Sequence, residues 1–394
     1  MKKLIAIAVV FALVMGGVFA ETSISGSASG RLALGTGMTG EQSKVTGSGD
    51  LFVKFTGENE DGTFGGELMF GGDNWSNPVK DAKSNVWWKP IDMLKVQIGS
   101  AQWGTFGIGD AKTGWNVTES LQDLNLWIYD YNGTNYYGNS VGFAGNGFGG
   151  YDGIGLFLSV YPISGLEFNM AFPFKYQDDP MAVYKQFYAE VGYNIDGIGK
   201  IMAGFQSDYF DLDGTVTNAK SRHGGMGVSF DLSALQGKGL DLAFKLHTGL
   251  PTVNDDLSLK RSEPLNMAIG GGFATGDFKL RFRFAGEFLG KTTNTVDDSF
   301  IKDPANIRFG LCPLYNISGD LLIGVSFDVR INGLGEMFPE NPYTTEVYWH
   351  TSPAIQYSVG PGKFRAGVNV GAPSSPMSTG KIQWEIPIQL GYSF

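Results

Sequence analysis

Alternation of apolar and polar residues constrains the fold of this chain more than any other feature. In 276–288, GDFKLRFRFAGEF, phenylalanine and leucine alternate with Lys279, Arg281 and Arg283, and the same period of two recurs in 318–332, SGDLLIGVSFDVRIN. Successive side chains of a β-strand point to opposite faces of a sheet, so each segment predicts a strand with one apolar and one polar face. Because such segments recur along the chain, the sequence predicts an all-β protein.

The alternating segments suit either a large soluble β-protein or a membrane-spanning β-barrel. Each apolar face runs for four to six residues, which matches the apolar band that tilted strands of ~9–11 residues build in a barrel. Charged residues make up only 17% of the chain, below the ~25% of ordinary soluble proteins. The barrel is therefore favoured. Aromatic residues also recur near the predicted strand ends, as interfacial girdles require: Trp87, Trp88, Tyr161, Tyr193, Tyr357 and Tyr392.

Turn signals divide the chain into hairpins. Short turns are predicted at 58–62, 89–92, 162–165, 194–197, 235–239, 274–277, 316–320 and 359–362. Longer polar segments lie between them, at 71–82, 102–150, 175–184, 207–222, 249–262, 289–304 and 331–345. Short turns at one rim and long loops at the other are typical of outer-membrane barrels. The prediction is a transmembrane antiparallel up-and-down β-barrel of 16–18 strands, with 18 favoured because it includes a first strand near 23–35 and a last strand near 382–394.

The first twenty residues, MKKLIAIAVVFALVMGGVFA, differ from the rest. Two lysines, an apolar run and a small-residue end predict a cleaved signal peptide over residues 1–20. The apolar run is too short to cross a hydrocarbon core of ~30 Å as a helix. Residues 21–394 are then expected to form one barrel domain. The net charge of −10 argues against nucleic-acid binding, and the single cysteine, Cys312, excludes an internal disulfide framework.

With its signal peptide, serial hairpins and terminal phenylalanine, the chain resembles bacterial outer-membrane β-barrel proteins of the porin type. The ending WEIPIQLGYSF alternates down to Leu390, Tyr392 and Phe394. The resemblance implies that these three residues are a signal for the outer-membrane assembly machinery and that the mature protein lies in outer-membrane lipid. It also makes a homotrimer one option. Pro387 departs from an ideal closing strand because proline lacks a ladder donor, so a local bulge is expected there.

The segment 102–150 is the longest predicted loop and is rich in Trp, Tyr and Asn. Loops of that length are usually functional or disordered, and this composition argues against disorder. Two alternatives stay open: the loop folds inward and constricts the pore, as the corresponding porin loop does, or it forms an extracellular flap. In the first case four residues would supply negative charge to the pore: Asp110, Glu119, Asp123 and Asp130.

A barrel of this width should enclose water, so the polar strand faces are expected to line a pore. Seven basic residues share the inward parity: Lys279, Arg281, Arg283, Arg308, Arg330, Lys363 and Arg365. Opposed to loop acids, they would create a transverse field that orients solutes. The alternative is that they are ordinary hydrated wall residues paired with Glu287 and Asp328.

Enzyme chemistry is not predicted. The three histidines, His223, His247 and His350, are scattered without metal-ligand spacing, and no cofactor site or metal site is expected. The sequence favours an outer-membrane channel for passive diffusion of small hydrophilic solutes, with saccharides or anions as candidate classes. Two other functions are kept: a surface adhesin or receptor with a closed pore, and an uptake channel for hydrophobic compounds. An outer-membrane hydrolase ranks behind them.

Overall fold

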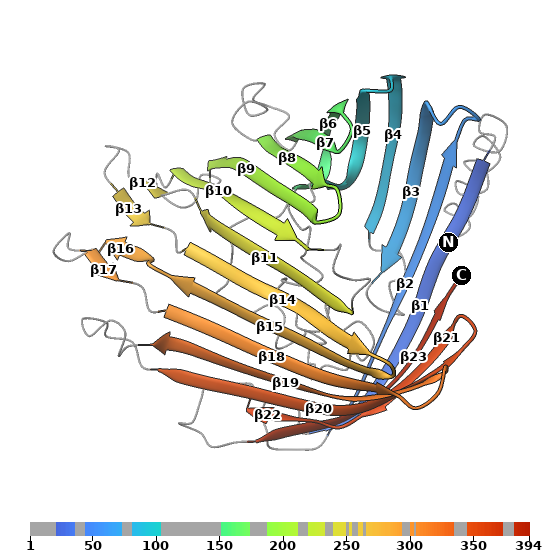
Figure 1. Ribbon diagram of the computed structural model, residues 1–394, viewed down its shortest axis with the longest axis vertical. Coiled ribbons are helices and arrows are strands. Elements are labelled where there is room, and N and C mark those ends of the chain that lie inside the picture. Colours follow the sequence, from blue (N-terminus) through green and yellow to red (C-terminus); the bar gives the residue numbers. More distant parts are fainter. Residues whose placement is uncertain are drawn as a thin grey trace.

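Strand β1 (Glu21–Gly35) pairs antiparallel with strands from both ends of the chain. On one side it pairs with β2 (Lys44–Glu58), and on the other with β23 (Gln383–Ser393). The backbone of Gly26 also exchanges hydrogen bonds with Phe394, at 2.8 and 2.9 Å. The sheet therefore closes on itself, and the N-terminal and C-terminal strands lie side by side in the computed structural model (Figure 1).

The structure describes residues 21–35, 44–72, 81–103, 151–173, 187–211, 220–232, 239–249, 252–253, 259–262, 265–293, 300–302, 305–334, 345–372 and 382–394. The predicted signal peptide and almost all of the predicted long loop lie outside these residues.

Consecutive strands pair around the ring in chain order. Between β2 and β23 the wall contains β3 (Phe64–Gly72), β4 (Asp81–Ile91), β5 (Leu94–Trp103), β6 (Tyr151–Ile163), β7 (Leu166–Pro173), β8 (Phe187–Ile195), β9 (Gly199–Asp211), β10 (Lys220–Asp231), β11 (Leu240–Gly249), β14 (Leu265–Thr275), β15 (Phe278–Phe288), β18 (Ala305–Asn316), β19 (Leu321–Leu334), β20 (Glu346–Val359), β21 (Gly362–Gly367) and β22 (Asn369–Ala372). Since β21 and β22 pair with the same two neighbours, they are halves of one wall strand. The described residues thus form an antiparallel barrel of eighteen strands, which confirms the favoured prediction.

The predicted short turns within the described residues fall at one rim, called here the short-turn rim; of the predicted turn 235–239 only Gly239 is described. Each lies at the connection between two consecutive strands that pair antiparallel. Gly276 and Gly360 occupy two of these turns with φ of 54° and 53°, a left-handed conformation that glycine adopts without steric cost. The opposite rim, where the predicted polar segments connect the strands, is called the long-loop rim.

Two of the segments predicted to be loops contain strands. β12 (Thr252–Val253) and β13 (Leu259–Ser262) pair with each other, and β13 also pairs with β16 (Lys291–Thr293), which pairs with β17 (Phe300–Lys302). The polar segments 249–262 and 289–304, predicted as long loops, thus contain the strands of a small four-stranded sheet. Its strands have two to four residues, too few to give an alternation signal, and they form because paired backbone groups satisfy each other's hydrogen bonds.

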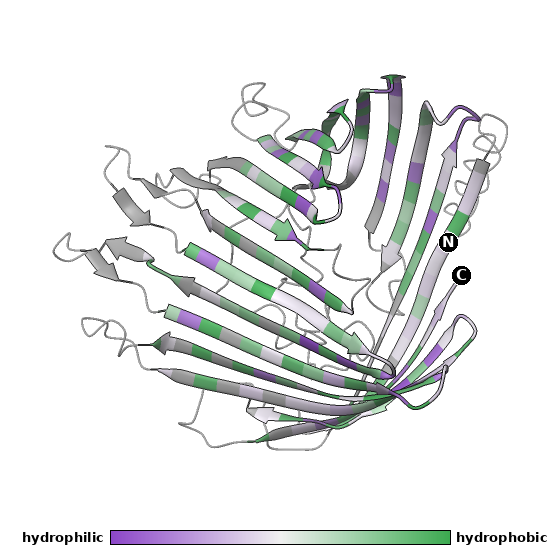
Figure 2. Ribbon diagram, in the orientation of Figure 1, coloured by the Kyte–Doolittle hydropathy of each residue, from purple (hydrophilic) through white to green (hydrophobic). Residues whose placement is uncertain are grey.

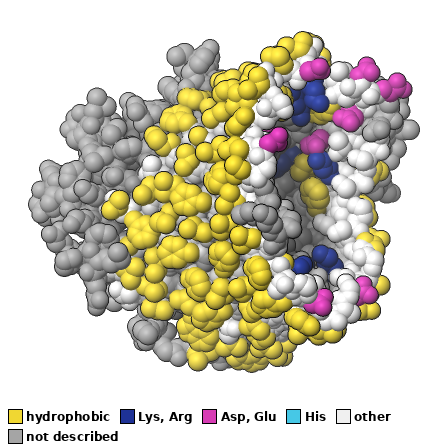
Figure 3. Space-filling view, in the orientation of Figure 1, with side chains coloured by type: hydrophobic (Ala, Val, Ile, Leu, Met, Phe, Trp, Pro, Cys, Tyr) yellow, Lys and Arg dark blue, Asp and Glu magenta, His cyan; other side chains and the backbone are white. Residues whose placement is uncertain are grey.

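Polarity in the barrel is reversed relative to a soluble protein. Large apolar side chains stand exposed on the outer face, as for Ile24 at 55% and Leu390 at 61%, whereas Glu190 and Asn85 on the inner face are only 5% and 3% exposed. The strands alternate in hydropathy along their length (Figure 2). Hydrophobic side chains cover the outer wall, and basic and acidic side chains line the hollow visible in Figure 3. The inner face is called the lumen face below.

Pro387 is not accommodated by a bulge, so that expectation is wrong. The register of β1 and β23 runs without a shift from Ser27↔Ser393 to Gly35↔Glu385, through Ala33↔Pro387. The irregularity lies in the neighbouring strand instead, where β21 ends at Gly367 and β22 begins at Asn369. Val368, between these two halves, donates to the backbone oxygen of Pro353 on β20 at 3.0 Å. Proline donates no ladder hydrogen bond in return, so the interruption lies beside two prolines, Pro353 and Pro387, while the register is kept.

The predicted girdle residues divide between the two faces. Trp88 is 54% exposed on the outer face, and Tyr161, Tyr193, Tyr357 and Tyr392 are exposed there near the short-turn rim. Trp87 is only 7% exposed and, by the strand period, faces the lumen. It is therefore not a girdle residue, because adjacent strand positions cannot share a face. Within the described ranges, no helix is long and apolar enough to cross a membrane.

Candidate pore wall

A chain of polar contacts crosses four strands on the lumen face. Lys54 of β2 forms an ion pair with Glu67 of β3, with 2.5 Å between Nζ and Oε1. The Asn85 amide on β4 donates to the same carboxylate at 3.5 Å, and Gln97 on β5 donates to Asn85 Oδ1 at 2.6 Å. The Lys54–Glu67 contact is charge-assisted and therefore the strongest of the series. This part of the lumen face is polar, and its side chains are hydrogen-bonded from strand to strand.

Next to this series of contacts, two lysine side chains lie over the indole of Trp87. The Nζ atoms of Lys89 and Lys95 lie 5.1 and 4.9 Å from the centroid of a Trp87 ring. Both distances fall within the ~6 Å range of cation–π attraction. None of the three was predicted to line the pore. The sequence could have indicated this site, because Trp87 and Lys89 are two positions apart and so share a face of the strand. The adjacent Trp88, which faces the other way, obscured that pattern.

Two ion pairs on the wall bridge across an intervening strand. Arg281 of β15 reaches Asp241 of β11, with 3.3 Å between Nη1 and Oδ2. In the register of the sheet, Gly272 of β14 pairs with both of these residues. A Cβ at Gly272 would lie 2.6 Å from Nη1 of Arg281. The glycine therefore leaves the space through which the guanidinium passes.

The second bridging pair repeats the arrangement on other strands. Lys200 of β9 forms an ion pair with Glu167 of β7, and Gly192 of β8 lies between them, where a Cβ would come within 2.9 Å of both side chains. Further along β8, Tyr188 and Asn169 donate hydrogen bonds to the carboxylate of Glu190, the amide at 2.8 Å. The buried carboxylate is thus hydrogen-bonded, as burial of a charge requires.

Near the C-terminus the wall is a network of amides and one guanidinium. Arg365 donates to Oε1 of Gln356 at 2.7 Å and to Oε1 of Gln389 at 3.5 Å. Ser352 donates to Asn369, whose amide in turn donates to Glu385 at 3.3 Å. These contacts span β20 to β23 and keep Arg365 against the wall.

The predicted basic residues fall into two groups. Lys279, Arg281, Lys363 and Arg365 have described side chains on the lumen-face parity, with Lys363 exposed and the others half-buried. The side chains of Arg283, Arg308, Arg330 and Glu287 lie outside the description, although Arg308 and Arg330 are opposite each other in the register of β18 and β19. Their role in permeation stays a prediction.

Of the predicted acidic residues, the structure describes the side chain of Asp328 alone. Asp328 lies on β19 and is 3% exposed, opposite His350 in the register. The four loop residues Asp110, Glu119, Asp123 and Asp130 lie outside the described residues, so both interpretations of 102–150 stay open. For Arg281 the carboxylate partner is Asp241 rather than Glu287 or Asp328, because β11 and β15 both pair with β14 and its register brings the two side chains within reach.

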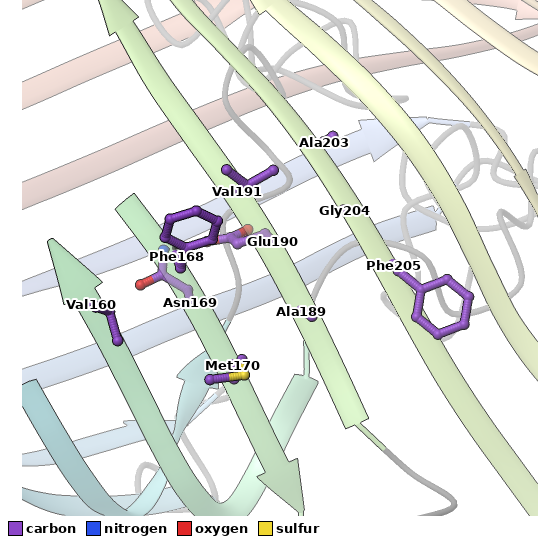
Figure 4. Close-up of a pocket in the computed structure, with 10 residues that line it drawn as sticks. All are labelled: Val160, Phe168, Asn169, Met170, Ala189, Glu190, Val191, Ala203, Gly204 and Phe205. Carbon is purple, nitrogen blue, oxygen red and sulfur yellow. Dashed lines mark hydrogen bonds between the residues drawn. The ribbon is translucent and has the colours of Figure 1, made fainter. Parts of the chain in front are cut away.

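Two apolar features complete the wall. Cys312 is fully buried in a cluster with Leu314 and Leu322. On the outer face, a groove of about 580 Å³ crosses β6 to β9 (Figure 4). Small residues such as Ala189 and Ala203 line it together with the larger Met170 and Phe205. Among the described residues, no group of three His, Cys, Asp or Glu side chains could hold a metal ion.

No protein-family model matches the chain, and no curated protein matches it significantly. Solved structures do. An anion-selective porin from Comamonas acidovorans aligns with TM-score 0.54 and 11% identity over 95% of this chain and 99% of that chain. OmpF of Salmonella typhi, solved as a complex with daunomycin, aligns with TM-score 0.52 and 12% identity over 95% and 97%. Pseudomonas aeruginosa OpdL aligns with TM-score 0.51 and 12% identity over 95% and 99%. The chain therefore has the fold of the bacterial outer-membrane porins.

Proposed function

We propose that this protein is an outer-membrane channel through which small hydrophilic solutes diffuse passively. One observation carries the proposal: a closed ring of eighteen strands in the described residues presents apolar side chains outward and hydrogen-bonded charged side chains inward. Lipid can solvate the outer face, and only water or polar solutes can solvate the inner one.

The width of the ring supports a permeable lumen. Eight strands leave an interior that side chains fill, whereas 16–18 strands leave an aqueous channel. Function then depends on what lines the opening. The lumen face of the described strands carries ion pairs on β2–β3, β7–β9 and β11–β15, so a permeating solute meets fixed charges of both signs.

The proposal also covers export, membrane assembly and oligomeric state. Residues 1–20 direct export and are removed, and residues 21–394 form the membrane domain. Leu390, Tyr392 and Phe394 present exposed apolar side chains on the closing strand, which suits recognition by the assembly machinery. The channel is proposed to have no enzymatic activity and to work as a homotrimer.

Conductance in planar bilayers tests the proposal. The mature chain, refolded in detergent and checked for barrel formation by far-ultraviolet circular dichroism, should give stepwise, ohmic currents in KCl. Liposomes containing it should admit small sugars, with rates that fall as the sugar becomes larger. A folded protein that shows no conductance at any voltage would refute the channel and favour the closed-pore adhesin. Transport of apolar compounds without ion conductance would favour the hydrophobic-uptake alternative.

A further inference from the structure

We propose that Lys89 and Lys95, held on the lumen wall by Trp87, form a contact site for small anionic solutes at the short-turn rim. The inference rests on the proposed channel function and names one of its solute classes and the residues that select for it. The ligands expected are chloride, phosphate and carboxylate groups, which are the anions that ammonium groups bind as point charges.

Trp87 attracts both ammonium groups. The Nζ atoms of Lys89 and Lys95 lie 5.1 and 4.9 Å from the centroid of a Trp87 ring, and the indole itself is 7% exposed. A lysine side chain loses conformational entropy when it binds a ligand. Because attraction to the ring already restricts Lys89 and Lys95, less entropy is lost when an anion binds. Trp87 is thus a positioning residue, and the lysines make the contact.

Gly65 makes this arrangement possible. It is opposite Trp87 in the register of β3 and β4, and a Cβ at this position would lie 2.3 Å from Cζ2 of the indole. Any side chain at residue 65 would push the ring away from the wall. The ring lies against backbone instead, with its lysines on the side of the lumen.

Both lysines at Trp87 remain charged and are not paired with a carboxylate through the ring. Lys54, Glu58 and Glu67 lie near Lys95, and Glu60, Asp61 and Asp92 lie in the short turns at the same rim. Glu67 is already bound by Lys54 and by Asn85. Trp87 is uncharged, so it holds Lys89 and Lys95 without neutralising them. In the two bridging pairs described above, by contrast, each cation lies against a carboxylate.

The site also lies on the route that solutes take. Lys89 and Lys95 flank the short turn between β4 and β5, at Asp92 and Met93, and therefore stand at the short-turn mouth of the lumen. An anion that enters or leaves through this mouth passes within reach of both charges, since fixed charges act over about 8–10 Å at physiological ionic strength.

Reversal potentials in a KCl gradient test the site. The Lys89→Gln, Lys95→Gln double variant should lower the anion-to-cation permeability ratio by roughly two-fold or more. Inorganic phosphate added on the short-turn side should block chloride current in the unaltered channel, and the double variant should need several-fold more phosphate for half block. A charge-matched Lys279→Gln, Lys363→Gln variant should change the phosphate block less.

A variant without a charge change separates positioning from charge. Trp87→Leu keeps both lysines and should raise the half-blocking phosphate concentration, and Trp87→Phe should restore part of the block. If Trp87→Leu does not fold, the double lysine variant still decides. A conducting double variant with unchanged permeability ratio and phosphate block would overturn the anion site while leaving the channel function intact. An unaltered protein without conductance would instead overturn the channel itself.

Discussion

Arg281 on β15 forms an ion pair with Asp241 on β11 by passing over Gly272 of the strand between them. The same arrangement joins Lys200 to Glu167 over Gly192. Glycines that weaken a strand locally thus let charges on next-nearest strands meet on the lumen wall. This arrangement leads to the first two predictions.

Asp241→Asn should increase anion preference. Removing the carboxylate leaves the guanidinium of Arg281 without its negative partner in a water-filled lumen, so the fixed charge there becomes more positive. Reversal potentials in a KCl gradient should shift toward the chloride equilibrium potential. Asp241→Glu keeps the charge and serves as the control. An unchanged reversal potential in Asp241→Asn would show that this pair does not influence permeating ions.

Gly272→Val should separate the two charges. The new side chain occupies the space used by Arg281, and because the pair is partly solvated its loss should cost no more than about 1 kcal/mol of unfolding free energy. Urea unfolding of the barrel in detergent measures this cost, and reversal potentials report the displaced guanidinium. The matched control is Gly391→Val, since a Cβ at Gly391 meets nothing within 4 Å. Equal effects of the two substitutions would contradict the bridging role of Gly272.

An introduced arginine should destabilise the barrel much more at one position of β19 than at the next. Val325 is exposed on the outer face, whereas Ser326 faces the lumen. Val325→Arg should destabilise the barrel in lipid vesicles by about 2–4 kcal/mol, the cost of an arginine on the lipid face near the midplane. Ser326→Arg should cost much less because water solvates it. Urea titrations in vesicles measure both, and similar costs would argue against the assigned faces.

Trp87 and Trp88 should differ in their exposure to lipid. Brominated acyl chains quench tryptophans that contact them, and only Trp88 stands on the outer face. With eight tryptophans in the chain, the comparison is between variants: Trp88→Phe should remove more of the quenchable fluorescence than Trp87→Phe. The opposite order would place Trp87 in the girdle, as the sequence suggested.

Pro387→Ala should leave stability nearly unchanged or raise it slightly. The register across Pro387 is continuous, so an alanine can enter the strand without rearrangement and add one backbone donor, worth about 0.5–1.5 kcal/mol at most. Urea unfolding measures the change. A loss of more than about 1 kcal/mol would mean that the proline ring itself stabilises the closing strand.

The alternating segments and turn signals together predicted the barrel, a strand number of 16–18 with 18 favoured, and the position of its short turns. Alternation is a property of each strand alone, and turn residues are local, so both can be recognised without knowing which strands meet. The four-stranded sheet β12-β13-β16-β17 could not be predicted, because its strands are too short to show a period. The expected bulge at Pro387 was also wrong, because the register of β1 and β23 continues across it without a shift.

The sequence by itself determined which residues share a face, and hence that Arg281 and Arg365 point away from Phe282 and Phe364. Only the tertiary structure decided which side chains on different strands contact each other. Asp241 and Arg281 are forty positions apart, and their contact depends on the register of three strands and on a glycine in the middle one. The partnership of Trp87 with Lys89 and Lys95 likewise depends on Gly65 of the adjacent strand. Parity is fixed within one strand, whereas contact depends on the pairing and register that bring separate strands together.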